Sequence, residues 1–259
     1  MSDLARVSLS VRDDVARITL SGSVDSCAID LQFAREFLHV VSSVEDSGAR
    51  AIVLVADRPH FCFGGDLKAM AAAGDQLPNL LQDLATNLHA GICRLANGKI
   101  PVITGVVGVA AGAGFGLVLA SDIVIAGRSA KFSPAYGAVG LTPDAGCSYF
   151  LPRIIGRTRT IELLLLNRVL DAATALDWGI VNSVVDDDTV SLRTAETAAR
   201  IAQGPKRAYE SMKRLIMAAD LECHLEKESE CIVQQGGLRE SHEGIRAFIE
   251  KRPANFKAI

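Results

Sequence analysis

Two glycine turns carry backbone groups that could hold an anionic oxygen. Gly64-Gly65-Asp66 and Gly112-Ala113-Gly114 each follow an apolar run typical of a strand and precede a helical pattern. The first N–H groups of a helix have no partner within it and carry partial positive charge. If the two turns lie side by side, the N–H groups of Gly65 and Ala113 converge on one oxygen and form an oxyanion hole. Either turn alone is more simply an ordinary tight turn, so it is the pair that indicates a site.

Two side chains are candidates for proton transfer. Asp144 follows Pro143 in the sequence GLTPD, where its carboxylate could act as a general base or cap a helix beginning near Ala145. His89 lies on an amphipathic helical pattern, where a packing role is the simpler interpretation and a functional role the alternative. Without further context, the capping role is also the simpler interpretation of Asp144.

The segment between Lys99 and Asp122 surrounds the second turn and carries no charge between its ends. Its length suits a transmembrane helix, but Pro101 and the β-branched residues after it are typical of a strand. A dinucleotide-binding G-x-G-x-x-G loop would need glycine where Leu117 stands, and Asp122 comes too early for the ribose-binding acid. We interpret the segment as a buried strand, a glycine turn and a helix that opens near Ala113.

Composition excludes several classes of protein. The 259 residues suit one large domain or a domain with a helical tail, and the formal charge of −3 gives no indication of nucleic acid or an anionic membrane as a partner. The first ten residues have no apolar targeting core. Six scattered cysteines without zinc spacing predict buried thiols in a reducing, cytoplasmic setting and no metal site.

Hydrophobic periodicity predicts the elements that must position these groups. We expect a hairpin at 7–20, strands at 51–56, 101–106, 122–126 and 130–132, and a polar loop at 74–78. Helices are expected at 28–44, 67–70, 80–95, 148–155, 158–166, 174–178, 189–203, 205–219, 221–235 and 241–251. A strand–turn–helix unit recurs about three times before Gly127, and helices dominate afterwards. This order predicts an α/β core over 1–200 and a C-terminal helical region over 201–259.

Five motifs together resemble the crotonase superfamily of enoyl-CoA hydratases and isomerases over nearly the whole chain. The motifs are FCFGGDL (61–67), GVVGVAAGAGFGLVLASDIVIA (105–126), SAKFSPAYGAVGLTPDAGCSYFLPRIIG (129–156), DWGIVNSVV (177–185) and AFIEKRPANF (247–256). The resemblance implies a spiral of ββα units with a helical trimerisation region, assembled as a homotrimer or a dimer of trimers. It also implies an acyl-CoA substrate whose thioester oxygen binds the Gly65 and Ala113 N–H groups. No cofactor is implied beyond the coenzyme A of the substrate.

The same resemblance assigns the remaining binding residues. The first turn is expected to lie against the adenine and pantetheine of coenzyme A, and two C-terminal residues to close over the nucleotide, often in a neighbouring subunit. The predicted substrate-binding residues are Phe63, Asp66, Leu67, Gly112, Tyr136, Leu141, Phe248 and Lys251.

Departures from the family pattern bear on the activity. The two glutamates that activate water in hydratases are replaced here by Gly116 and Tyr136, which disfavours hydration. An acid at the position of Asp144 is the catalytic residue in Δ3,Δ2-enoyl-CoA isomerases and in the ring-epoxide isomerase of phenylacetate catabolism, the branch that this chain most resembles. We therefore predict an acyl-CoA isomerase of fatty-acid or aromatic catabolism, with Asp144 as general acid and base.

Three alternatives remain open. In the similar 4-chlorobenzoyl-CoA dehalogenases, an aspartate at the position of Asp144 attacks the ring and a histidine at the position of His89 activates water. A hydratase with water held by the backbone and Tyr136 is the second alternative. A non-catalytic CoA-binding protein is the third. Its only hint of a polyanion partner is the two basic pairs at 206–207 and 213–214, which we interpret as a solvated face.

Overall fold

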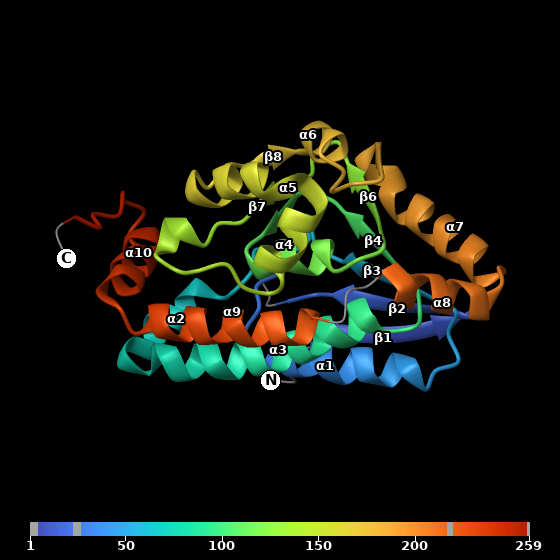
Figure 1. The fold of residues 1–259 in the computed structure, drawn as a ribbon, viewed down its shortest axis with the longest axis horizontal. Helices are drawn as coiled ribbons and strands as arrows, with labels where there is room; N and C mark the ends of the chain where they lie inside the picture. Colours follow the sequence, from blue (N-terminus) through green and yellow to red (C-terminus); the bar gives the residue numbers. More distant parts are fainter. Residues whose placement is uncertain (1–4, 23–26, 217–219, 258–259) are drawn as a thin grey trace.

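The computed structural model describes residues 5–22, 27–216 and 220–257. Residues 1–4 of the N-terminal segment, and the last three residues of the helix expected over 205–219, lie outside these ranges. The expected hairpin is confirmed as β1 (Val7–Arg12) and β2 (Val15–Leu20), which pair antiparallel. Figure 1 shows the strands between one layer of helices along the bottom of the view and another along the top, with the hairpin at the edge of the sheet.

The main sheet has the strand order β1-β2-β3-β4-β6-β9, and every pair beyond the hairpin is parallel. Its further strands are β3 (Ala51–Ala56), β4 (Val102–Val106), β6 (Ile123–Gly127) and β9 (Ser183–Val185). Both faces are covered, which explains why β3 reads as a continuous apolar run. Ile52 and Leu54 belong to the larger core with α1 and α3, whereas Val53 and Val55 pack with residues of α7 on the opposite face.

A second, smaller sheet holds the glycine turns in place. It comprises β5 (Val109–Ala111), β7 (Lys131–Ser133) and β8 (Leu170–Asp171). Isolated bridges join Ile29 to Gly65 and Cys62 to Ala110, so the first turn runs alongside the second. Helix α4 (Ala113–Leu119) then begins where the sequence predicts it. The strand–turn–helix repeat therefore brings the two turns together.

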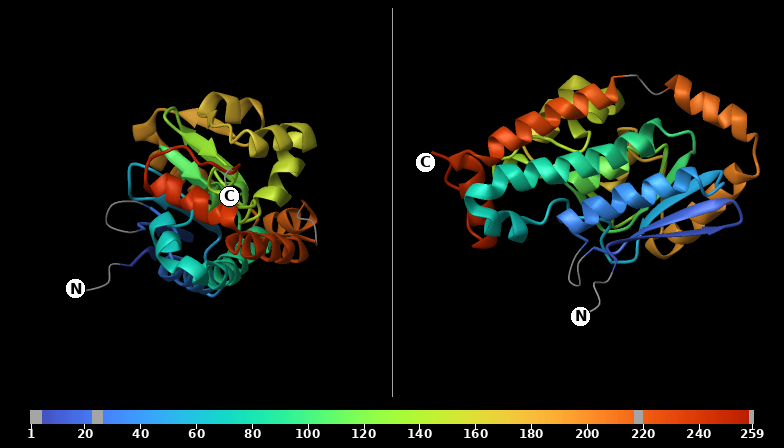
Figure 2. Two further views of the ribbon diagram at one scale, coloured as in Figure 1. Left: turned by 90° about the vertical axis from the view of Figure 1, so that its left-hand side faces the viewer. Right: turned by 90° about the horizontal axis from the view of Figure 1, so that it is seen from below.

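Three long helices lie side by side across one face, as the right-hand view of Figure 2 shows. They are α1 (Leu31–Glu45), α3 (Leu77–Asn97) and α9 (Leu221–Gly236). The remaining helical elements are α2 (Leu67–Ala73), η1 (Gly74–Gln76), η2 (Gly137–Val139), α5 (Cys147–Leu165), α6 (Ala172–Asp177), η3 (Asp187–Thr189), α7 (Val190–Ala202), α8 (Lys206–Ile216) and α10 (Arg239–Ile249). The α/β class and the C-terminal helical region are confirmed.

The polar loop predicted at 74–78 is wrong. A short 3₁₀ helix occupies 74–76, and α3 begins at Leu77. Pro78 suggested a loop, but it lies in the first turn of α3, where proline costs no helical hydrogen bond. Helix α5 joins two predicted helices across a kink at Gly156, whose φ is 76°. The strand expected at 130–132 is confirmed as β7, whereas the short strands β5, β8 and β9 were not predicted, because two or three residues seldom show a period.

Two surface interpretations also need correction. Lys213 is buried and donates to the backbone oxygens of Leu95 and Ile100 and to Asp122, at 2.9, 3.0 and 2.7 Å. It anchors α8 and does not belong to a solvated face. The cysteines are only partly as expected, since Cys223 and Cys231 are exposed on α9. Among the described residues, the helices are all too short or too polar to traverse a lipid bilayer.

Candidate active site

The two glycine turns are in direct contact. A Cβ atom added at Gly64 would lie 2.7 Å from the Ala111 carbonyl oxygen and 3.1 Å from the Ala113 nitrogen. Gly64 also has a φ of 81°, in the left-handed region that favours glycine. Backbone bonds fix the alignment, because Cys62 N donates to Val109 O at 3.0 Å and Ala111 N to Cys62 O at 2.8 Å. Only glycine at position 64 allows the two backbones to approach so closely.

Gly65 and Ala113 offer the backbone donors that the sequence singles out. Ala113 is the first residue of α4, preceded by Gly112 as N-cap with a φ of 52°. Within the described residues, neither the Gly65 nor the Ala113 N–H donates a hydrogen bond. Two unpaired N–H groups on adjoining turns are what an oxyanion hole requires.

The residues that follow Asp144 pack against the second turn and the helix after it. The Cys147 thiol, three residues further on, contacts the Gly112 carbonyl oxygen at 3.8 Å. On the other side, a Cβ atom at Gly116 would collide with the carbonyl oxygen of Ala145. Helix α4 therefore packs directly on the residue after Asp144, and the site at Gly116 has no room for a glutamate side chain.

The carboxylate of Asp144 does not cap a helix. The N-cap of α5 is Gly146, with no side-chain cap bond. The Asp144 side chain instead meets His89 of α3, with Oδ1 2.5 Å from the ring Nε2. Because an ionised carboxylate only accepts, Nε2 carries the hydrogen. The structure thus joins the two predicted proton-transfer residues, which are 55 positions apart in the chain.

His89 and Asp144 are both almost fully buried. Burial by itself lowers the pKa of His89, but the Asp144 charge and hydrogen bond outweigh it and raise that pKa above 6.5. Glu228 and a hydrogen bond with the Leu225 backbone act in the same direction. His89 therefore carries its proton at a higher pH than a free histidine.

Glu228 of α9 is a third member of the site, which sequence reasoning missed. One carboxylate oxygen accepts from Gly146 N at 2.7 Å, and the other accepts from Ser148 N at 2.9 Å and from the Ser148 hydroxyl at 2.5 Å. It therefore satisfies the start of α5 in place of a cap. The sequence signal was the position of Glu228 among Leu221, Leu225 and Ile232, a helical stripe that is otherwise apolar and buried.

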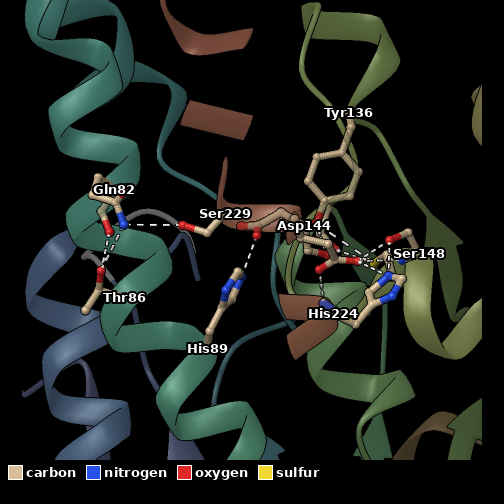
Figure 3. A network of polar contacts seen from close by, with 12 residues as sticks. Gln82, Thr86, His89, Tyr136, Asp144, Ser148, His224 and Ser229 are labelled. Atoms are coloured by element: carbon tan, nitrogen blue, oxygen red, sulfur yellow. Dashed lines mark hydrogen bonds and ion pairs between the residues drawn. The ribbon is translucent and has the colours of Figure 1, made fainter. Parts of the chain in front are cut away.

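The three groups form one buried cluster, and Figure 3 shows two of them, His89 and Asp144, pointing toward one another. One ligand-type atom from each of His89, Asp144 and Glu228 lies within 4.8 Å of the others. Such a set could coordinate a metal ion, but His89 and Asp144 are bonded to each other and both oxygens of Glu228 accept backbone hydrogens. His89, Glu228 and one oxygen of Asp144 therefore already have protein partners, and the absence of a metal remains a prediction.

Burial and the nearby Asp144 charge raise the pKa of Glu228 to about 7, against the lowering by Ser148, Gly146 and His89. Between its usual pKa near 4.5 and this value, the folded chain binds more protons than the unfolded chain. The stability that Glu228 contributes is therefore complete below about pH 4.5, falls as the pH rises from there, and is lost once the pH has passed about 7.

We expect the substitution Glu228→Gln to flatten this pH dependence, because glutamine does not titrate and its carbonyl can still accept from Gly146. Between pH 5 and pH 8, wild type should lose on the order of 3 kcal/mol more unfolding free energy than the variant. Urea denaturation at several pH values measures this. Glu230→Gln, an exposed position on the same helix, should behave as wild type. Equal pH profiles for Glu228→Gln and wild type would contradict the assignment.

Tyr136 supports the loop and is not free for acid–base chemistry. Its hydroxyl donates to the backbone oxygen of Asp144 at 2.9 Å. Burial, together with the charges of Cys147, Asp144 and Glu228, holds the pKa of Tyr136 well above its usual value. The phenol therefore stays neutral and fixes the residue that carries the carboxylate.

The remaining predicted binding residues make no polar contact with this cluster among the described residues. The Asp66 carboxylate is the N-cap of α2, bonded to Lys68 N at 2.9 Å and Ala69 N at 3.2 Å. Leu67 starts that helix, and Phe63 is exposed against the His60 ring. A cavity of about 570 Å³ is lined by residues of α2 and α10. Helix α10 carries Phe248 and precedes Lys251. Leu141 is buried in the main core. Their contact with coenzyme A stays a prediction.

Comparison with known proteins agrees with the fold. The family described as enoyl-CoA hydratase/isomerase matches residues 10–258. A protein named probable enoyl-CoA hydratase from Rhodobacter capsulatus is 36% identical over 80% of this chain and 81% of its own. The 1,2-epoxyphenylacetyl-CoA isomerase of Escherichia coli K12 is 37% identical over 82% of each chain. A 4-chlorobenzoyl coenzyme A dehalogenase of Arthrobacter is 30% identical over 95% and 91%.

Among solved structures, the enoyl-CoA hydratase from Bacillus halodurans aligns with a TM-score of 0.88 at 25% identity, covering 93% of this chain and 99% of that one. The matched family spans both glycine turns, Asp144 and the C-terminal helices that complete the cluster. The chain therefore belongs to the enoyl-CoA hydratase/isomerase family of the crotonase superfamily.

Proposed function

We propose that this protein is an acyl-CoA isomerase that moves a double bond from the 3,4 to the 2,3 position of an acyl thioester. The thioester oxygen binds the N–H groups of Gly65 and Ala113, which stabilise the enolate formed when a C2 proton leaves. Asp144 takes that proton and returns it at C4. Because the same carboxylate serves both steps, the reaction consumes no water and leaves the protein unchanged.

The observation that carries this proposal is the placement of Asp144. Its buried carboxylate is not used as a helix cap and is held by His89 through Oδ1, and the segment that carries it packs on the second glycine turn through Cys147. Within the described residues, Oδ2 has no hydrogen-bond partner, which leaves one oxygen for the substrate proton. A general base needs this reach and a fixed orientation.

Hydration is less well supported. A hydratase holds its water between two carboxylates on one side of the enoyl group, but Gly116 has no space for a side chain and Tyr136 is a buried neutral phenol. Asp144 and Glu228 are the buried carboxylates of the cluster, and Glu228 is engaged with the start of α5. The relatives include proteins named as hydratases and as isomerases, so the assay must compare hydration with isomerisation.

The test is a side-by-side assay of 3-enoyl-CoA and 2-enoyl-CoA substrates over several chain lengths. We expect 3-enoyl-CoA to give the conjugated 2-enoyl product, detected by its ultraviolet absorbance, with little formation of 3-hydroxyacyl-CoA from the 2-enoyl series. Faster hydration than isomerisation, or acyl-CoA binding without turnover of any substrate, would overturn the proposal.

Aryl-CoA dehalogenation is the second candidate, because it uses an aspartate and a histidine together and His89 contacts Asp144 directly. The similarity to a 4-chlorobenzoyl coenzyme A dehalogenase adds support. In this reaction Asp144 would displace the halide, and His89 would activate the water that releases the aryl ester. Halide release from 4-chlorobenzoyl-CoA, with ¹⁸O from labelled water entering Asp144 in one turnover, would favour it over isomerisation.

A further inference from the structure

The hydroxyl of Ser148 links the buried cluster to a second histidine, as Figure 3 shows. Its oxygen lies 2.5 Å from Glu228 Oε1 and 2.8 Å from His224 Nε2. A serine hydroxyl has one hydrogen, and the Glu228 carboxylate can only accept it. The contact with His224 is then a hydrogen bond from the ring N–H to the serine oxygen. Both hydrogen bonds therefore run in one direction, from His224 through Ser148 to Glu228.

The two ends of this chain lie in different surroundings. The Glu228 side chain is 3% exposed, and one of its oxygens lies within 4.8 Å of an Asp144 oxygen and of the His89 ring nitrogen, a span that one water molecule can bridge. The His224 side chain is 32% exposed. The chain thus starts at a buried carboxylate close to Asp144 and ends at a side chain that reaches solvent.

We propose that Glu228, Ser148 and His224 form a proton path between Asp144 and solvent. The inference rests on the proposed function, in which Asp144 carries the substrate proton during the lifetime of the enolate. Inward transfer begins at a protonated His224, which gives its Nε2 proton to the Ser148 oxygen as the serine hydrogen moves to Glu228. His224 is left neutral and takes a new proton from water. Glu228 then exchanges its proton with Asp144, and the reverse order carries a proton out.

The charges around the path suit transfer in both directions. Glu228, with a pKa of about 7, faces Asp144 and His89 as well as Ser148. Burial and the Arg153 charge lower the pKa of His224 below 6.5, with Lys227 acting the same way and Asp220 opposing them. Proton transfer is efficient when donor and acceptor have similar proton affinities near the working pH.

The path predicts that a solvent hydrogen can reach C4 of the product. We would run isomerisation of a 3-enoyl-CoA in D₂O and measure, by mass spectrometry, the deuterium at C4 per turnover. Ser148→Ala, which keeps the backbone bond to Glu228, and His224→Phe, which keeps the ring contact with Tyr149, should each lower this fraction by about tenfold. Ser148→Thr restores a hydroxyl and should recover the wild-type fraction.

Ser229→Ala is the matched control, because Ser229 neighbours Glu228 on α9 and bonds to Gln82, away from the path. It should leave the deuterium fraction unchanged. Equal fractions in wild type, Ser148→Ala and His224→Phe, or no deuterium at C4 in wild type, overturn the path alone. Equal fractions would point to exchange through the groove between α3 and α9, which His89 borders. If wild type does not isomerise any 3-enoyl-CoA, the proposed function fails and the path fails with it.

Discussion

Asp144→Asn is expected to lower isomerisation by about 10³ to 10⁴, the upper range for loss of a general acid–base group. Asparagine has nearly the same shape, and its carbonyl oxygen can still accept from His89 Nε2. It cannot take the C2 proton, because its amide is not basic. The loss should therefore appear in kcat, with the affinity for acyl-CoA close to that of wild type.

A second substitution separates the role of Asp144 from that of His89. In an isomerase, His89 holds the carboxylate through Oδ1, so His89→Gln should lower kcat by less than Asp144→Asn does. In a dehalogenase, the same substitution should stop release of the aryl ester after halide has left. Asp144→Asn with more than about a tenth of wild-type isomerisation would be incompatible with general base catalysis by this residue.

Ala113→Pro should lower kcat by about 10² to 10³, the effect typical of losing one oxyanion donor. Ala113 is the first residue of α4, where proline fits the helical φ and removes an N–H that no described residue accepts. The substitution therefore deletes the donor, places the proline ring where that hydrogen pointed, and leaves the helix its own hydrogen bonds.

Ala113→Gly is the matched control, because it keeps the N–H and removes only a methyl group. Its activity should stay within severalfold of wild type, and thermal unfolding should show that both variants fold. Binding of free coenzyme A, which has no thioester carbonyl, should be similar in the two variants. Comparable kcat values for Ala113→Pro and Ala113→Gly would show that the turn does not stabilise an oxyanion.

Local patterns in the chain were sufficient for most of the architecture. The hairpin and the long helices repeat a period of two or 3.6 residues over enough positions to be recognised, and the buried strands are short continuous apolar runs. The prediction failed for elements that are too short to show such a pattern or whose pattern is interrupted. Strands β5, β8 and β9 are only two or three residues long, and the start of α3 was obscured by Pro78, which a first helical turn accommodates.

The candidate site, too, was predicted only in part from the sequence. The sequence alone identified the two glycine turns and Asp144 as candidates. Glycine is required at position 64 because its φ is 81° and the backbones are in close contact there, and proton transfer requires a titratable group such as Asp144. The sequence also excluded a transmembrane or dinucleotide-binding interpretation of the central apolar segment.

Tertiary structure alone decided what each carboxylate does. Asp144 could cap α5 or point into a cluster, and Glu228 on α9 takes the helix start from 82 residues away, which leaves Asp144 to His89. Lys213 was likewise interpreted from the sequence as part of a solvated face, but in the folded chain it donates a hydrogen bond to Asp122. The physical reason is that a side chain's protonation and partners depend on neighbours distant in sequence, whereas helices, strands and turns depend on neighbours along the chain.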